Sequence, residues 1–113
     1  MIAVALDAFS DVLGLLRRVG RFGLNVLSCD QASLARRFAS KGPDKAEGTD
    51  WTTDHGSPRL AGVSGWLACE VSDVVAGGDH WIVLGSVLAA EAGAGTPMTY
   101  HASTFGRHSR VEA

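Results

Sequence analysis

The chain has 113 residues, of which 46% are hydrophobic and 19% charged, as expected for one small globular domain. Ten lysines and arginines against twelve acidic residues give a formal charge of -2, which argues against a nucleic-acid partner. The longest apolar run, 81–90, is too short to span a bilayer, so we expect no membrane partner.

The N-terminal segment is apolar but has no basic residues, so we do not interpret it as a signal peptide. The two cysteines, Cys29 and Cys69, are far apart and form no CxxC motif. This cysteine usage favours a reduced, cytoplasmic protein.

The first half of the chain alternates strands with helices. The run 2–6 is continuously apolar and predicts a buried strand with neighbours on both sides. Ser10 is placed to cap a helix over 11–19 that Gly20 ends. Its apolar residues at helical spacing are expected to face the core: Val12, Leu15, Leu16 and Val19.

Alternating apolar residues predict a second strand over 21–28, and Asp30 is expected to cap a second helix that ends near Ser40. Residues 41–62 are polar and rich in glycine, proline and aspartate, which predicts a long loop interrupted by Trp51. The stretch 17–45 holds seven of the ten cations, which indicates either an anion site or solvated helix faces.

The second half predicts strands over 65–75 and 80–91, joined through a Gly-Gly turn as a hairpin. A short strand over 98–101 follows, and the polar tail from Ser103 is expected to be frayed or docked on a partner. The fold class is therefore α+β, mainly β, with a barrel-like antiparallel sheet and two helices.

Sequence motifs for common catalytic sites are absent. The chain has no GxGxxG, Walker or HExxH motif, and its four histidines lack metal-ligand spacing. We therefore expect no metal site and no classical catalytic acid, base or nucleophile. A redox enzyme of this composition must borrow its chemistry from a bound cofactor.

Several motifs, in order along nearly the whole chain, resemble those of flavin reductases with the FMN-binding split-barrel fold. The stretch 20–27 with Asp30-Gln31 resembles GRFxVNVLxxDQ, and 35–39 with Asp44-Lys45 and Trp51 resembles ARRFA...DKFxGxxW. The stretch 77–80 matches the GGDH turn, and Tyr100-His101 with Gly106-Arg107 resembles the YHxGxYG ending.

The resemblance implies an incomplete split barrel that forms a homodimer, with FMN or FAD bound near the interface and NADH or NADPH as co-substrate. It also implies that residues 1–113 correspond to the C-terminal two-thirds of the family fold, with the N-terminal segment absent. The expected function is NAD(P)H:flavin reductase, supplying reduced flavin to a partner monooxygenase.

The resemblance places two groups of site residues. On the flavin side it implies Asp7, Ser10, Asp11, Arg37, Phe38 and Lys41. On the nicotinamide side it implies Asp79, His80, Tyr100 and His101. Four of these positions also have an ordinary structural interpretation: Ser10 as a helix cap, Arg37 as an exposed helical residue, Phe38 as a core residue and His80 as a turn residue.

Two alternatives remain open at this point. In the first, the chain is a truncated relative of the reductases that dimerises and binds flavin with little or no turnover. In the second, it is another flavin oxidoreductase on the same barrel. Asp11 departs from the family pattern and brings a negative charge beside the expected phosphate site, and Ala46 replaces an aromatic residue. We therefore expect weak flavin binding and slow turnover.

Overall fold

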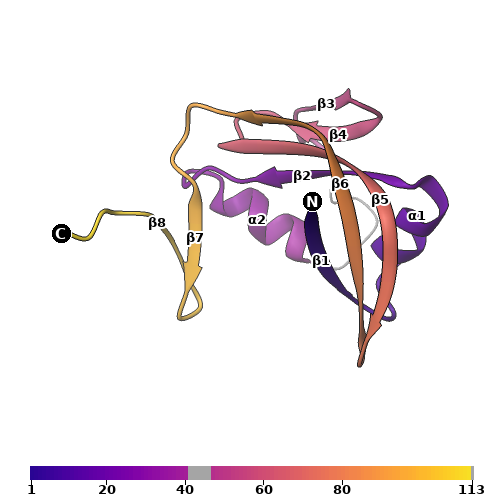
Figure 1. Cartoon of the computed structure of the whole chain (residues 1–113). Coiled ribbons are helices and arrows are strands. Elements are labelled where there is room, and N and C mark those ends of the chain that lie inside the picture. Colours follow the sequence, from indigo (N-terminus) through magenta and orange to yellow (C-terminus); the bar gives the residue numbers. More distant parts are fainter. Residues whose placement is uncertain (41–46, 113) are drawn as a thin grey trace.

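The computed structural model describes residues 1–40 and 47–112, and a curved antiparallel sheet dominates this part of the chain (Figure 1). Lys41, one of the expected flavin contacts, lies outside the described residues. The elements in chain order are β1 (Ile2–Asp7), α1 (Asp11–Val19), β2 (Arg21–Val26), α2 (Ala32–Ala39), β3 (Trp51–Asp54), β4 (Ser57–Leu60), β5 (Gly65–Gly77), β6 (His80–Ala92), β7 (Met98–His101) and β8 (Thr104–Arg107).

The main sheet has the strand order β1-β6-β5-β2. Its centre is the β5–β6 hairpin, whose two-residue turn needs the positive φ of +65° at Gly78. Register shifts at Ala68/Cys69 and at Val71/Asp73 break the ladder, and such bulges bend strands and increase their twist. The predicted hairpin is confirmed, and the bulges explain why the long strands curl into half a barrel.

The expectation that the first strand is buried between two neighbours is wrong. Strand β1 lies at the edge of the sheet and pairs with β6, with Ile2 opposite Gly85 and Asp7 opposite His80. Its side chains alternate between half-buried and exposed, as in a strand that covers a core on one face only.

Helix α1 packs on the sheet with a different face from the one predicted. Leu13 and Leu16 are buried against Val83, whereas Val12, Leu15 and Val19 are about half exposed. Both faces of this helix are apolar, so spacing alone could not decide which face meets the sheet. Only Leu16 of the predicted set is in the core.

A second core cluster lies at the other end of the sheet. Trp66, Ala68 and Val63 are buried, and Leu27, Leu60 and Ala89 pack around them. Trp66 is 2% exposed and forms the centre of this cluster.

The region predicted as a long loop contains a hairpin. Strands β3 and β4 pair from Trp51 opposite Leu60 to Asp54 opposite Ser57. The turn residues His55 and Gly56 both have positive φ, which is the geometry of a tight hairpin turn. These two strands are short and lie in a polar stretch, so the sequence pattern did not predict them.

The C-terminal tail is also more ordered than predicted. Strand β8 pairs with β7, with Tyr100 opposite Phe105 and His101 opposite Thr104. The turn residues Ala102 and Ser103 adopt positive φ. Because neither is a glycine, the sequence carries no local signal for a turn at this position.

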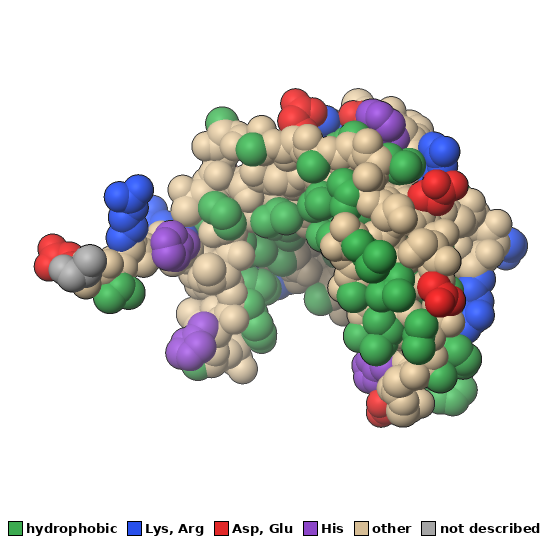
Figure 2. Space-filling view, in the orientation of Figure 1, with side chains coloured by type: hydrophobic (Ala, Val, Ile, Leu, Met, Phe, Trp, Pro, Cys, Tyr) green, Lys and Arg blue, Asp and Glu red, His purple; other side chains and the backbone are tan. Residues whose placement is uncertain are grey.

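The assembled elements confirm the predicted fold class of a mainly β, half-barrel domain with two helices. Figure 2 shows a hollow between two limbs, one formed by β1 and the β5–β6 turn and the other by the β7–β8 hairpin, with hydrophobic side chains along it. Among the described residues, neither helix is long and apolar enough to cross a membrane.

Candidate functional site

The loop between β1 and α1 meets the turn between β5 and β6 at one corner of the sheet. The Ala8 amide donates a hydrogen bond to the Asp79 carbonyl at 3.1 Å, and Asp7 lies opposite His80 in the antiparallel register. The fold therefore brings together four residues that the sequence analysis divided between flavin and nicotinamide: Asp7 and Ser10 with Asp79 and His80.

His80 and Asp79 form a hydrogen-bonded pair at this corner, and each shifts the pKa of the other. His80 Nδ1 lies 2.8 Å from Asp79 Oδ1, and the His80 side chain is 44% exposed. The hydrogen bond to Asp79 raises the pKa of His80, with smaller charge effects from Asp79 and Asp7, while desolvation opposes them. The same hydrogen bond lowers the pKa of the Asp79 carboxyl.

Ser10 stands at the N-cap position of α1, as predicted, but its side chain makes no capping hydrogen bond. Its amide instead donates to the Asp7 carbonyl at 2.9 Å. The Ser10 hydroxyl and the first amides of the helix are donors suited to an anion. Asp11 in the first turn places a carboxylate beside them.

Arg37 and Phe38 lie on α2, apart from that corner. The Arg37 guanidinium donates to the Glu47 carbonyl at 2.9 Å and to Thr49 Oγ1 at 3.0 Å, so it ties residues 47–49 to α2. Phe38 is 36% exposed, which makes its core interpretation wrong. It lines a hollow of about 280 Å³ with Asn25, Trp51, Pro58 and Leu60.

Tyr100 and His101 lie on the opposite limb from His80 within one chain (Figure 1). The Tyr100 ring packs against Phe105 with centroids 5.0 Å apart and is 65% exposed. Arg36 of α2 stacks over the Phe105 ring at 5.2 Å, which braces the β7–β8 hairpin. One chain therefore does not place the two predicted nicotinamide contacts beside His80.

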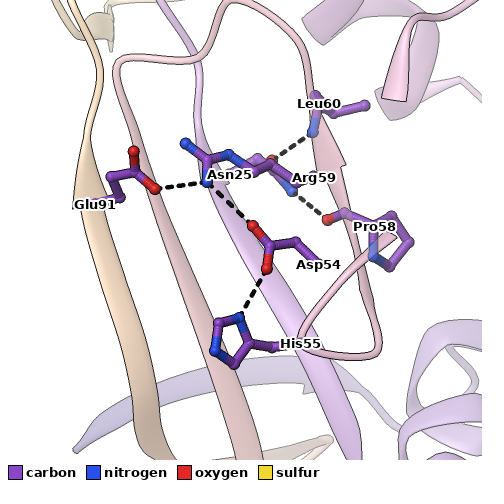
Figure 3. Close-up of polar contacts among 7 residues, drawn as sticks. All are labelled: Asn25, Asp54, His55, Pro58, Arg59, Leu60 and Glu91. Atoms are coloured by element: carbon purple, nitrogen blue, oxygen red, sulfur yellow. Dashed lines mark hydrogen bonds and ion pairs between the residues drawn. The ribbon is translucent and has the colours of Figure 1, made fainter. Parts of the chain in front are cut away.

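Asn25 and Gln31, which belong to the first of the family-like motifs, make structural contacts. The Asn25 side chain donates to the Pro58 carbonyl and accepts from the Leu60 amide, which ties β4 to β2 (Figure 3). The Gln31 side chain accepts from the Ser28 amide and donates to the Ala61 carbonyl. Gln31, and not the predicted Asp30, precedes α2, and its side chain makes no cap.

An ion network that the sequence did not predict joins Arg59 to Asp54 and Glu91 (Figure 3). The Arg59 guanidinium lies 3.2 Å from Asp54 and 2.7 Å from Glu91, and it stacks over the Trp66 ring at 4.9 Å. Arg59 lowers the pKa of Glu91, and His55 followed by Arg59 lowers that of Asp54. These residues lie on four different strands (β3, β4, β5 and β6) and on the β3–β4 turn, so only the fold assembles them.

Among the residues that the structure describes, no three histidine, cysteine, aspartate or glutamate side chains are grouped to hold a metal.

Comparison with solved structures defines the class of fold. The chain superimposes on the Streptomyces globisporus NADH:FAD oxidoreductase SgcE6 with a TM-score of 0.89 at 28% identity, covering 96% of this chain and 68% of that one. The same oxidoreductase has been solved with NAD and FAD fragments, and that structure matches with a TM-score of 0.88 at 28% identity, over 95% of this chain and 67% of that one. The half barrel is thus the barrel fold of flavin reductases.

Residues 1–109 match the flavin reductase like domain, and the chain belongs to that family. It is 39% identical over 107 residues to the reductase component of a 4-nitrophenol 4-monooxygenase/4-nitrocatechol 2-monooxygenase from Rhodococcus opacus, covering 94% of this chain and 57% of that protein. It is 45% identical over 73 residues to a Pseudomonas putida flavin reductase, covering 64% and 43%. The chain therefore spans about half the length of these relatives.

Proposed function

We propose that this protein is an NAD(P)H-dependent flavin reductase that passes a hydride from NADH or NADPH to FMN or FAD. The meeting of the Asp7–Asp11 segment with the Asp79-His80 turn carries the proposal, because it joins the flavin side and the nicotinamide side of the site. Membership of the flavin reductase family supports the same reaction.

The chain's residues bind and orient the two ligands. The Ser10 hydroxyl and the first amides of α1 fit the phosphate of a flavin as hydrogen-bond donors, while Asp7 and Asp11 oppose it by charge. His80, whose side chain is 44% exposed, would serve the nicotinamide as a hydrogen-bond donor. When bound, the flavin supplies the hydride acceptor, so the protein needs no acid, base or nucleophile of its own.

A steady-state assay tests the proposal. NADH is mixed with the 113-residue chain and either FMN or FAD, and absorbance is followed at the nicotinamide band. We expect NADH loss that requires both protein and flavin, and slower loss in His80→Ala. Loss that is equal with and without the folded protein would contradict the proposed function.

We also propose a homodimer. Several large apolar side chains are exposed on the strands around the hollow, including Val75 and Leu88 at 42% and Tyr100 at 65%. The family resemblance implies that a second copy of the chain covers these side chains. Tyr100 and His101 of that copy would then lie near His80 of the first. Sedimentation at micromolar concentration is expected to give twice the chain mass, and a clean monomer would contradict this proposal.

We further propose that the reduced flavin serves a separate monooxygenase, because several similar proteins are reductase components of monooxygenases. The free thiols of Cys29 and Cys69, both in the described part of the chain, support a reducing compartment such as the cytoplasm.

A further inference from the structure

His80 is faced by carboxylates from two different elements. Asp79 precedes it in the turn, with Oδ1 2.8 Å from His80 Nδ1. Asp7 ends β1 directly opposite His80 in the strand register. Asp7 is itself held in place, because its Oδ1 accepts the Phe9 amide at 2.8 Å.

We propose that Asp7 and Asp79 are positioning residues for His80, which hold its imidazole in one orientation and in the cationic form. Held in this way, the imidazole presents its Nε2–H to an acceptor oxygen of the nicotinamide cofactor. This inference rests on the proposed function. It assigns Asp7 to nicotinamide binding, through His80, instead of to the flavin contact that the family resemblance implies.

The geometry supports both parts of this role. The Asp79 contact occupies Nδ1, so Nε2 is the nitrogen left for a ligand, and the side chain is 44% exposed. The β5 residue opposite His80 is Gly77, which brings no charge. Arg17 of α1 stacks over the neighbouring Trp81 ring at 4.6 Å, and Asp11 begins that helix.

The charge balance around His80 fixes the sign of the pH effect. Hydrogen bonding to Asp79, then the charges of Asp79 and Asp7, raise the pKa of His80 above 6.5. The cationic form therefore persists to higher pH than in an ordinary histidine. Removing either carboxylate is expected to lower that pKa, so that the cation is lost earlier as the pH rises.

Proton titration of His80, followed by NMR of the histidine C–H groups, tests the positioning role without any assay of activity. We expect Asp79→Asn and Asp7→Asn to move the His80 midpoint to lower pH, with the larger change in Asp79→Asn. An asparagine at position 7 can still accept the Phe9 amide, so the loop is kept. The control is Asp73→Asn, on the same hairpin and exposed, which is expected to leave the midpoint unchanged.

Kinetics then test the link to the cofactor. At about pH 7.5 the KM for NADH is expected to be at least about threefold higher in Asp7→Asn and in Asp79→Asn than in the wild type. At about pH 5.5, where an ordinary histidine is cationic, the KM of both variants is expected to return toward the wild-type value. In His80→Ala the KM is expected to be about tenfold higher at both pH values, since a charge-assisted hydrogen bond is lost.

The outcomes separate the two claims. An unchanged His80 midpoint in both Asp7→Asn and Asp79→Asn would overturn the positioning role. A moved midpoint with a KM that does not follow pH would overturn its link to the cofactor. Absence of any NADH turnover in the wild-type protein would contradict the proposed function, and the titration would still decide the role of Asp7 and Asp79.

Discussion

Trp66→Ala is expected to destabilise the protein by about 3–5 kcal/mol, the largest effect that we predict for a single substitution. Trp66 is 2% exposed and is the centre of the cluster formed with Val63 and Ala68. Its ring also carries the stacked Arg59 guanidinium, so truncation removes the platform of the ion network. A small domain has a total stability of about 5–15 kcal/mol, so this loss leaves little folded protein in mild urea.

Urea unfolding followed by circular dichroism measures this effect, with Trp66→Phe as the matched control. Phenylalanine keeps an aromatic ring in the cluster, and the Trp66 indole nitrogen finds no acceptor among the described residues, so no such bond is lost. We expect Trp66→Phe to lose much less stability than Trp66→Ala. Equal midpoints for wild type and Trp66→Ala would show that this cluster is not the core of the second half of the sheet.

Asp11→Arg is expected to increase the affinity for FMN about tenfold, which corresponds to about 1.4 kcal/mol. The reversal removes a carboxylate from the first turn of α1 and puts a cation beside the donors proposed for the phosphate. The same change is unfavourable for the helix, because a cation opposes the positive end of the helix dipole by about 0.3–1 kcal/mol. Affinity and thermal stability are thus expected to move in opposite directions.

Isothermal titration calorimetry with FMN and with riboflavin, which lacks the phosphate, tests this prediction. We expect Asp11→Asn to show a smaller gain than Asp11→Arg for FMN, and both variants to bind riboflavin like wild type. An equal gain for riboflavin would place the effect on the ring instead of the phosphate. Unchanged FMN affinity in both variants would show that the N-terminus of α1 is not part of the flavin site.

The main sheet was predictable because its strands follow local rules. Strands β5 and β6 are rich in apolar residues on either side of a Gly-Gly turn, and both signals are independent of the rest of the chain. The β3–β4 and β7–β8 hairpins were missed because their turns place His55, Ala102 and Ser103 at positive φ. Such residues rarely adopt that conformation, so tertiary contacts and not propensity select it.

The candidate site was predictable only in part. Family motifs pointed to His80, but the pairing of Asp7 with it depends on the register between β1 and β6, which no local pattern specifies. The motif residues Asn25 and Gln31 turned out to fasten backbone segments 30 or more residues away. The burial of Leu13 in place of Val12 and Leu15 likewise followed from which side of α1 meets the sheet.

Anaerobic mixing of the protein, flavin and NADH tests the proposed hydride transfer most directly. The flavin absorbance and the nicotinamide absorbance are recorded together in a stopped-flow instrument, with the flavin in excess over protein. Hydride transfer predicts that both bands bleach at the same rate and in equal molar amounts, and that this rate falls in His80→Ala. Bleaching that is no faster than without the protein, although the chain is folded, would contradict the assignment of this chain as a flavin reductase.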